Sequence, residues 1–311
     1  MPEINANIND FEFFTFITGL EKKELYLIEK LINSFPYKRT HKLNIIDKTN
    51  ILKKNFSKKK KIYYSDRHYL VKQKLDFEFK KWELMTNKNN KIVNIIKEKK
   101  FYNHTKSIQN IFDIYAKKKF VVILDSDTVF KNNKYLNEII KKIKKIPKKY
   151  QKDIGAVGAI HQEAPFSLPL KKIFSHEFYK LFIRDKRIDT FSILKSLLKN
   201  LFKSKNLKSN RIHKLPRLWT SLLTLNKEII KKEKILSKYL WLEVFDFSNQ
   251  KKNMLPHRIM GDAGASILFG LGMAGKKIIN IDCDEFINHE RSGSRNKKIK
   301  QIEKSWLRFD Y

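Results

Sequence analysis

Cysteine, glycine and proline are all scarce in this sequence. Cys283 is the one cysteine among 311 residues, which excludes an internal disulfide and a metal site built from several cysteines. The longest apolar run, around residues 267–274, is interrupted by glycine and is far shorter than the roughly 20 residues that span a bilayer. The first ten residues are polar and acidic and lack the basic region of a secretory signal. We therefore expect a cytoplasmic protein, either soluble or peripheral to the inner membrane face.

Acidic residues are also few relative to basic ones. The 32 aspartates and glutamates face 67 lysines and arginines, which gives a net charge of +35. Lysine, asparagine, isoleucine and phenylalanine are over-used together, as A/T-rich coding would produce, so the charge favours anionic partners only in a general sense. Nucleic acid is not expected, because the lysines are spread along the chain and no helix-turn-helix, RNA-recognition or zinc module is recognisable.

Apolar periodicity predicts alternating strands and helices, which is typical of an α/β domain with a mostly parallel central sheet. The predicted strands cover residues 13–18, 43–47, 92–96, 120–124, 154–160, 218–225 and 277–281. A helix is predicted after Gly19, and others at 107–116, 135–146 and 262–274. The five consecutive apolar residues at 120–124 are typical of a central strand that is covered on both faces.

Two segments interrupt this alternation within a single predicted domain of residues 10–311. Residues 51–90 are irregular, and we interpret them as a variable insertion with short helices. Residues 165–217 form a basic, partly helical insertion, in which twelve basic residues from position 180 onwards accompany two aspartates. Apolar residues recur there at helical spacing between positions 191 and 202. Such a helix either lies on an anionic membrane or packs on the domain by its apolar stripe.

Two carboxylates follow the central predicted strand. Asp125 and Asp127, separated by Ser126, would present hard oxygen ligands to Mg²⁺ or Mn²⁺ and leave coordination positions for phosphates and water. An ion held there would neutralise charge on a departing diphosphate. The alternative is that aspartate is common after strands because it suits turns.

Two further candidates lie in the C-terminal half. Asp262 precedes an apolar helix, where an aspartate often serves as a cap or a first-turn charge. His289 lies in a polar stretch, where a histidine is often simply solvated. Their order and spacing after the Asp-x-Asp strand make them candidates for the same site.

In this order the segments resemble the family 2 glycosyltransferases and their GT-A relatives. The matching pieces are FFTFITGL at 13–20, NIID at 44–47, NHTKSIQNIFDIY before VVILDSD, GDAGASILFGLGMAGKKI at 261–278 and FINHERSGS at 286–294. The resemblance covers most of the chain outside residues 51–90 and 165–215. It implies one GT-A-like domain that transfers a sugar from a nucleotide-diphosphate sugar to a glycan or lipid-linked acceptor.

The resemblance also implies roles for individual residues on the donor side. The nucleotide sugar would be held by Thr18 after the first strand, Asp47 after the second, His104 at a helix start, Asp125 and Ser294. The first strand lacks the proline usual in the family, so the nucleotide loop is expected to differ in shape.

The same resemblance implies a metal site and a catalytic base. Asp125, Asp127 and His289 would hold the divalent ion, Mn²⁺ or Mg²⁺. Asp262 would deprotonate the acceptor, which makes an inverting reaction the expected outcome. An acidic pair is common before that helix in the family, whereas this chain has Gly261 and Asp262, so the base assignment departs from the pattern.

Three other functions compete with this interpretation. In a haloacid-dehalogenase-type phosphatase, Asp125 would be the nucleophile and Asp127 the acid and base. Ser266 and Ile267 stand where its second late acid is needed, and a long α/β stretch precedes its nucleophile strand. A sugar nucleotidyltransferase would need a glycine-rich loop after the first strand, where only Gly19 is present. A basic scaffold that binds membrane or nucleic acid would leave the acidic motifs unexplained.

Overall fold

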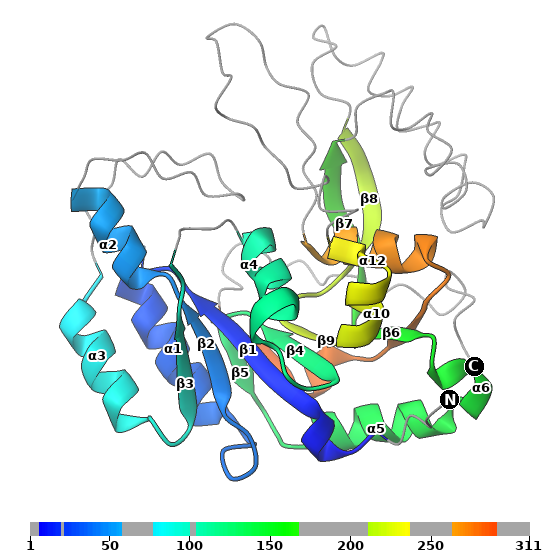
Figure 1. The fold of residues 1–311 in the computed structure, drawn as a ribbon, viewed down its shortest axis with the longest axis horizontal. Coiled ribbons are helices and arrows are strands. Elements are labelled where there is room, and N and C mark those ends of the chain that lie inside the picture. The colour runs from blue at the N-terminus through cyan, green and yellow to red at the C-terminus, as the bar shows by residue number, and fades with distance from the viewer. Residues whose placement is uncertain are drawn as a thin grey trace, which may run out of the picture.

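The centre of the molecule is a seven-stranded sheet with the order β10-β6-β9-β4-β1-β2-β3 (Figure 1). The structure, a computed structural model, describes residues 6–19, 22–57, 77–99, 104–167, 211–236 and 263–290. The strands are β1 (Phe11–Ile17), β2 (Leu43–Asp47), β3 (Val93–Lys97), β4 (Phe120–Leu124), β6 (Ile154–Gly158), β9 (Leu222–Asn226) and β10 (Lys277–Asn280). Each of these strands overlaps a predicted one.

Most of the sheet is parallel. β1 pairs in parallel with both β2 and β4, β2 with β3, and β10 with β6, whereas β9 is antiparallel to β4 and β6. The predicted α/β class with a mostly parallel central sheet is therefore confirmed. The strand order reverses between β1 and β4, so the chain has a topological switch point there, and ligands of open α/β sheets bind outside the carboxyl ends of such strands.

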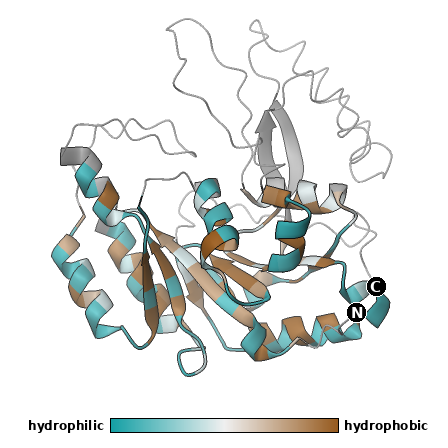
Figure 2. Ribbon diagram, in the orientation of Figure 1, coloured by the Kyte–Doolittle hydropathy of each residue, from teal (hydrophilic) through white to brown (hydrophobic). Residues whose placement is uncertain are grey.

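Helices cover both faces of the sheet (Figures 1 and 2). One face packs against α1 (Lys22–Ser34), α3 (Phe79–Lys88) and α5 (Tyr135–Lys145), and the other against α4 (His104–Asn110), the π-helix η2 (Ile111–Tyr115), α10 (Lys227–Lys232) and α12 (Ala263–Met273). All five residues of β4 are buried, and full burial of such an apolar side chain contributes about 1.5–3 kcal/mol. This double cover explains why the β4 sequence is apolar without alternation.

Two small antiparallel sheets stand beside the main one. β5 (Thr128–Phe130) pairs with β11 (Ile287–His289), and β7 (Ile160–Ser167) pairs with β8 (Arg211–Leu218). The first pair connects the segment after β4 with the end of the described chain. The remaining elements are η1 (Ile8–Asp10), α2 (Thr49–Ser57), α6 (Lys148–Gln151) and η5 (Cys283–Glu285).

The boundaries depart from the predictions in several places. The single strand predicted at 218–225 is two strands, because β8 ends at Leu218 and β9 begins at Leu222. The helix predicted at 107–116 starts earlier and ends in a π-helical turn. The chain turns at residues 219–221 within a largely apolar stretch, and the apolar pattern does not mark this break.

The two predicted insertions are only partly described. Residues 51–90 contain most of α2 and all of α3, and the segment 58–76 lies outside the described residues. The ends of the basic segment 165–217 belong to β7 and β8, and the amphipathic helix predicted between 191 and 202 lies outside the described residues. Within the described part of the chain, every helix is too short or too polar to cross a bilayer.

Candidate metal centre

Asp125 and Asp127 follow β4 at the carboxyl edge of the sheet, next to the switch point. A tight turn separates them from β5, and in it the Thr128 N–H donates to the Asp125 carbonyl at 3.1 Å. Asp127 is 3% exposed, whereas Asp125 is half-buried. The turn therefore places one carboxylate inside the protein and the other at its surface.

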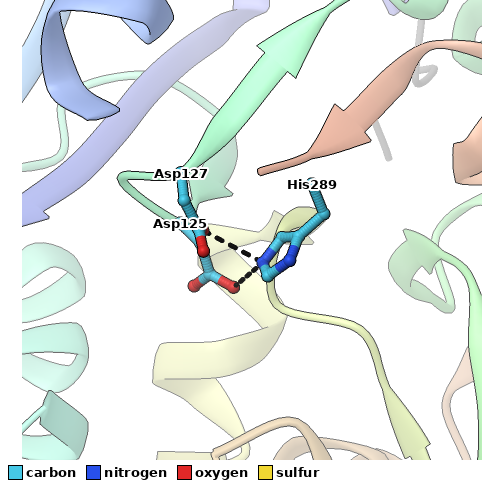
Figure 3. Close-up of side chains that lie close together, drawn as sticks. All are labelled: Asp125, Asp127 and His289. Atoms are coloured by element: carbon cyan, nitrogen blue, oxygen red, sulfur yellow. Dashed lines mark ion pairs between the residues drawn. The ribbon is translucent and has the colours of Figure 1, made fainter. Parts of the chain in front are cut away.

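His289 reaches the two aspartates through the pairing of β11 with β5. In that register His289 lies opposite Thr128, and the Glu290 N–H donates to the Asp127 carbonyl at 3.0 Å. Figure 3 shows the imidazole pointing toward both carboxylates. The pairing of two three-residue strands thus brings His289 to Asp127, although the two residues are more than 150 positions apart in the sequence.

The three side chains converge on one point. The His289 Nε2 atom lies 3.0 Å from the Asp127 Oδ1 atom and 3.6 Å from the Asp125 Oδ2 atom. One ligand atom from each residue lies within 4.8 Å of the others. The structure therefore brings together the three residues predicted as metal ligands.

The electrostatics of the cluster depend on the imidazole. Burial lowers the pKa of His289, but hydrogen bonds and charges from Asp125 and Asp127 outweigh burial and raise the pKa to about 9. The imidazolium then balances part of the carboxylate charge. A metal ion would replace that proton, since a ligating histidine is neutral.

The donor set fits a divalent cation. Two carboxylates and one imidazole supply three ligand atoms that lie within 4.8 Å of one another. Carboxylates suit Mg²⁺ and Mn²⁺, and the imidazole shifts the preference toward a transition metal. A shell completed by solvent or phosphate oxygens fits a site at the sheet edge.

The turn between β8 and β9 supports this cluster, and sequence reasoning missed it. The Ser221 hydroxyl donates to the Asp125 Oδ2 atom at 2.6 Å. The Trp219 ring lies beside the His289 ring, with 5.8 Å between their centroids. A serine within an apolar stretch gives no signal of this contact, because the contact depends on how β9 aligns with β4.

Two of the residues predicted to hold the nucleotide lie at this same edge, where Thr18 directly follows β1 and Asp47 is the last residue of β2. The Asp47 carboxylate accepts from the Thr49 N–H at 2.8 Å and from the Trp82 indole N–H at 3.1 Å. Thr18 is 5% exposed, and its hydroxyl and N–H both donate to Glu24. Both side chains are therefore held by hydrogen bonds within the protein. Contact of either residue with a nucleotide stays a prediction.

A buried ion pair lies beside these strand ends and was also missed. The Lys48 Nζ atom lies 3.9 Å from the Glu98 Oε2 atom, and both side chains are almost fully buried. Burial lowers the pKa of Lys48 to about 8 against the opposing charges of Glu98 and Glu24. Burial likewise raises the pKa of Glu98. A single sequence marks these residues only as charges near strand ends.

For the remaining predicted site residues the described part of the structure gives no side-chain contact. His104 begins α4, and Asp262 and Ser294 lie outside the described residues. The helix that Asp262 was predicted to open is present as α12 from Ala263 onwards. The roles of these three residues stay predictions.

Comparison with known proteins gives structural matches only. No protein-family model matches the chain, and no curated protein matches it in sequence. The mannosyltransferase PcManGT from Pyrobaculum calidifontis, solved in complex with GDP-Man and Mn²⁺, is similar over 90% of this chain and 58% of its own, at 10% identity and a TM-score of 0.41. S. aureus TarS 1-349 is similar over 89% of this chain and 59% of its own, at 10% identity and a TM-score of 0.40.

A third match covers more of its own length. Core-mannan synthase A from Aspergillus fumigatus, in its Mn/GDP form, is similar over 93% of this chain and 76% of its own, at 9% identity and a TM-score of 0.44. The chain spans less than two thirds of the first two proteins. The function has to be argued from the site itself.

The phosphatase alternative gains no support from the site. A nucleophilic aspartate would have to present a carboxylate oxygen to the substrate phosphorus. Here both carboxylates face one imidazole, and the Asp125 Oδ2 atom is engaged by Ser221. This arrangement suits ligands that share an ion better than a nucleophile beside an acid.

Proposed function

We propose that this chain is a metal-dependent glycosyltransferase of the GT-A type that uses a nucleotide-diphosphate sugar as donor. The observation that carries the proposal is the convergence of Asp125, Asp127 and His289 at the carboxyl edge of β4. The reversal of strand order between β1 and β4 supports a ligand crevice at the same place. An acidic metal site in such a crevice suits a donor that carries a diphosphate.

The three ligands have distinct tasks in this proposal. Asp127 supplies a buried carboxylate and His289 a neutral nitrogen, while Asp125 lies nearest to solvent and would face the donor. When bound, the ion would neutralise negative charge on the diphosphate leaving group. Because an imidazole is a poor ligand for Mg²⁺, we propose Mn²⁺ as the preferred ion.

The nucleotide would lie along the ends of β1 and β2. Thr18 directly follows β1 and Asp47 is the last residue of β2, while His104 begins the helix that covers them on one face. The glycine after Thr18 has a φ of +77°, and a Cβ atom at Gly19 would approach the Thr49 Cγ2 atom to 2.9 Å. Glycine therefore suits this turn both by its backbone conformation and by the close packing of Thr49. Ser294 is the fifth proposed contact of the donor.

We assign the general base to Asp262. It directly precedes α12, and deprotonation of an acceptor hydroxyl there would give direct displacement with inversion. A positioned base contributes on the order of 100-fold to 10,000-fold. Replacement by asparagine should lower turnover while donor affinity is kept.

The acceptor would be a glycan or a lipid-linked glycan. The basic segment 165–217 and the net charge of +35 support a peripheral position on an anionic membrane. Sedimentation with liposomes tests this: binding should rise with anionic lipid content and weaken with salt, and binding independent of lipid charge would overturn it.

The experiment for the function is a donor panel that includes GDP-mannose and UDP-GlcNAc. Release of free nucleoside diphosphate should require Mn²⁺ and stop in excess chelator. Asp127→Asn should lower it by at least about 100-fold without loss of folding, because charge is removed at nearly constant volume. Asp113→Asn, at an exposed position in η2, is the matched control.

Phosphate release from sugar phosphates would instead favour the phosphatase. Full activity in chelator, or full activity of Asp127→Asn, would contradict the metal-dependent mechanism.

A further inference from the structure

The turn between β8 and β9 makes a direct hydrogen bond to the cluster of Asp125, Asp127 and His289. Ser221 lies in this turn and is fully buried. Its hydroxyl donates to the Asp125 Oδ2 atom at 2.6 Å, and a carboxylate can only accept such a bond. The hydrogen bond therefore holds the same Asp125 oxygen that lies 3.6 Å from the His289 Nε2 atom.

The same residue is anchored through its backbone. The Ser221 carbonyl accepts from the Thr128 hydroxyl at 2.9 Å, and Thr128 is also fully buried. Thr128 in turn lies opposite His289 in the pairing of β5 with β11. Ser221 thus links the carboxylate of Asp125 to β5, the strand that pairs with the one carrying His289.

A second contact of this turn supports the histidine. The Trp219 ring lies 5.8 Å from the His289 ring at an angle of 50°, and the Trp219 N–H donates to the Ala159 carbonyl at 2.9 Å. The turn is therefore held by the backbone of Ala159, between β6 and β7, while it contacts two of the three proposed ligands. Its position follows from the packing of the main sheet.

We infer that Ser221 is a positioning residue that orients Asp125 for metal binding. The inference rests on the proposed function, since it concerns the same ion. Without the hydroxyl, the Asp125 carboxylate would rotate more freely about its last torsion. Groups that orient ligands in this way typically change metal affinity by about 10–100-fold when they are removed.

The chain offers a matched control on the same strand. Thr224 is fully buried, and its hydroxyl lies 2.9 Å from the Tyr135 hydroxyl. Thr224→Val removes a buried hydroxyl three residues from Ser221, away from the site. It should lower stability through the lost hydrogen bond and leave metal affinity unchanged.

The experiment measures Mn²⁺ affinity of the folded full chain by electron paramagnetic resonance, with no donor present. Ser221→Ala should weaken Mn²⁺ binding by about 10–100-fold, while Ser221→Thr, which keeps the hydroxyl, should retain most of the affinity. Thermal unfolding of each variant reports whether the fold is kept. In turnover assays, the loss in Ser221→Ala should be recovered at high Mn²⁺.

Two outcomes would overturn the inference. Equal Mn²⁺ affinity in wild type, Ser221→Ala and Thr224→Val would give Ser221 a purely structural role and leave the proposed function standing. Absence of Mn²⁺ binding in the wild type would remove both the metal site and the positioning role.

Discussion

At the scale of single residues, the buried charged side chains at the carboxyl edge of the sheet have different partners. The Asp127 carboxylate lies against the His289 imidazole, an arrangement that suits a metal ion. Lys48 and Glu98 instead face each other in the interior, and the Glu98 Oε1 atom has no hydrogen-bond partner in the described part of the structure. An ion pair buried this deeply is costly to form and still more costly to break.

We predict a large asymmetry when this ion pair is altered. Lys48→Met should lower the free energy of unfolding by about 3–5 kcal/mol, because it leaves the Glu98 carboxylate buried without its partner. The double variant with Glu98→Leu should recover most of that loss, since no charge remains to be buried. Chemical denaturation of the wild type, both single variants and the double variant measures this. Strictly additive losses would show that the two charges do not interact.

The ligand residues were predictable from the sequence to different degrees. Asp125 and Asp127 could be found because an uninterrupted apolar strand ends directly before them. Ser221 could not, since its contact with Asp125 is set by the antiparallel register of β4 and β9. Apolar periodicity predicts that a strand exists but leaves its direction and its partners open.

At the scale of elements, the pairing of β5 with β11 creates the metal centre. Each strand has three residues, too few for a periodic signal in the sequence. The strands of the main sheet were predicted because burial on one or both faces leaves a pattern over four or more residues. The pairing of β5 with β11 depends on backbone hydrogen bonds, which any residue except proline can make.

We therefore predict that the site is sensitive to proline at Glu290. Glu290→Pro removes the N–H that donates to the Asp127 carbonyl at 3.0 Å, and Mn²⁺ affinity should fall by at least about 10-fold. Glu290→Ala is the control, because it removes the same side chain and its 3.0 Å ion pair with Lys30 but keeps the N–H. A surface ion pair contributes little to stability, so the alanine variant should bind Mn²⁺ as the wild type does. Equal affinities in all three proteins would show that the pairing does not hold His289.

At the scale of the whole molecule, the topology of the sheet and the net positive charge of the chain both favour an anionic ligand. The acidic cluster stands beside the switch point between β1 and β4, where open α/β sheets bind their ligands, in a chain whose net charge is +35. A basic surface attracts anions, while a purely acidic cluster would repel a diphosphate. A bound cation resolves this conflict, because it converts the acidic cluster into an anion-binding site.

The most direct measurement is anomalous diffraction at the manganese edge from crystals grown with Mn²⁺ and a nucleoside diphosphate. The account predicts one strong anomalous peak in contact with Asp127, His289 and a diphosphate oxygen, with the nucleoside along the ends of β1 and β2. No peak should remain in crystals of Asp127→Asn. A diphosphate bound elsewhere, or a site without manganese between these side chains in the wild type, would contradict the account.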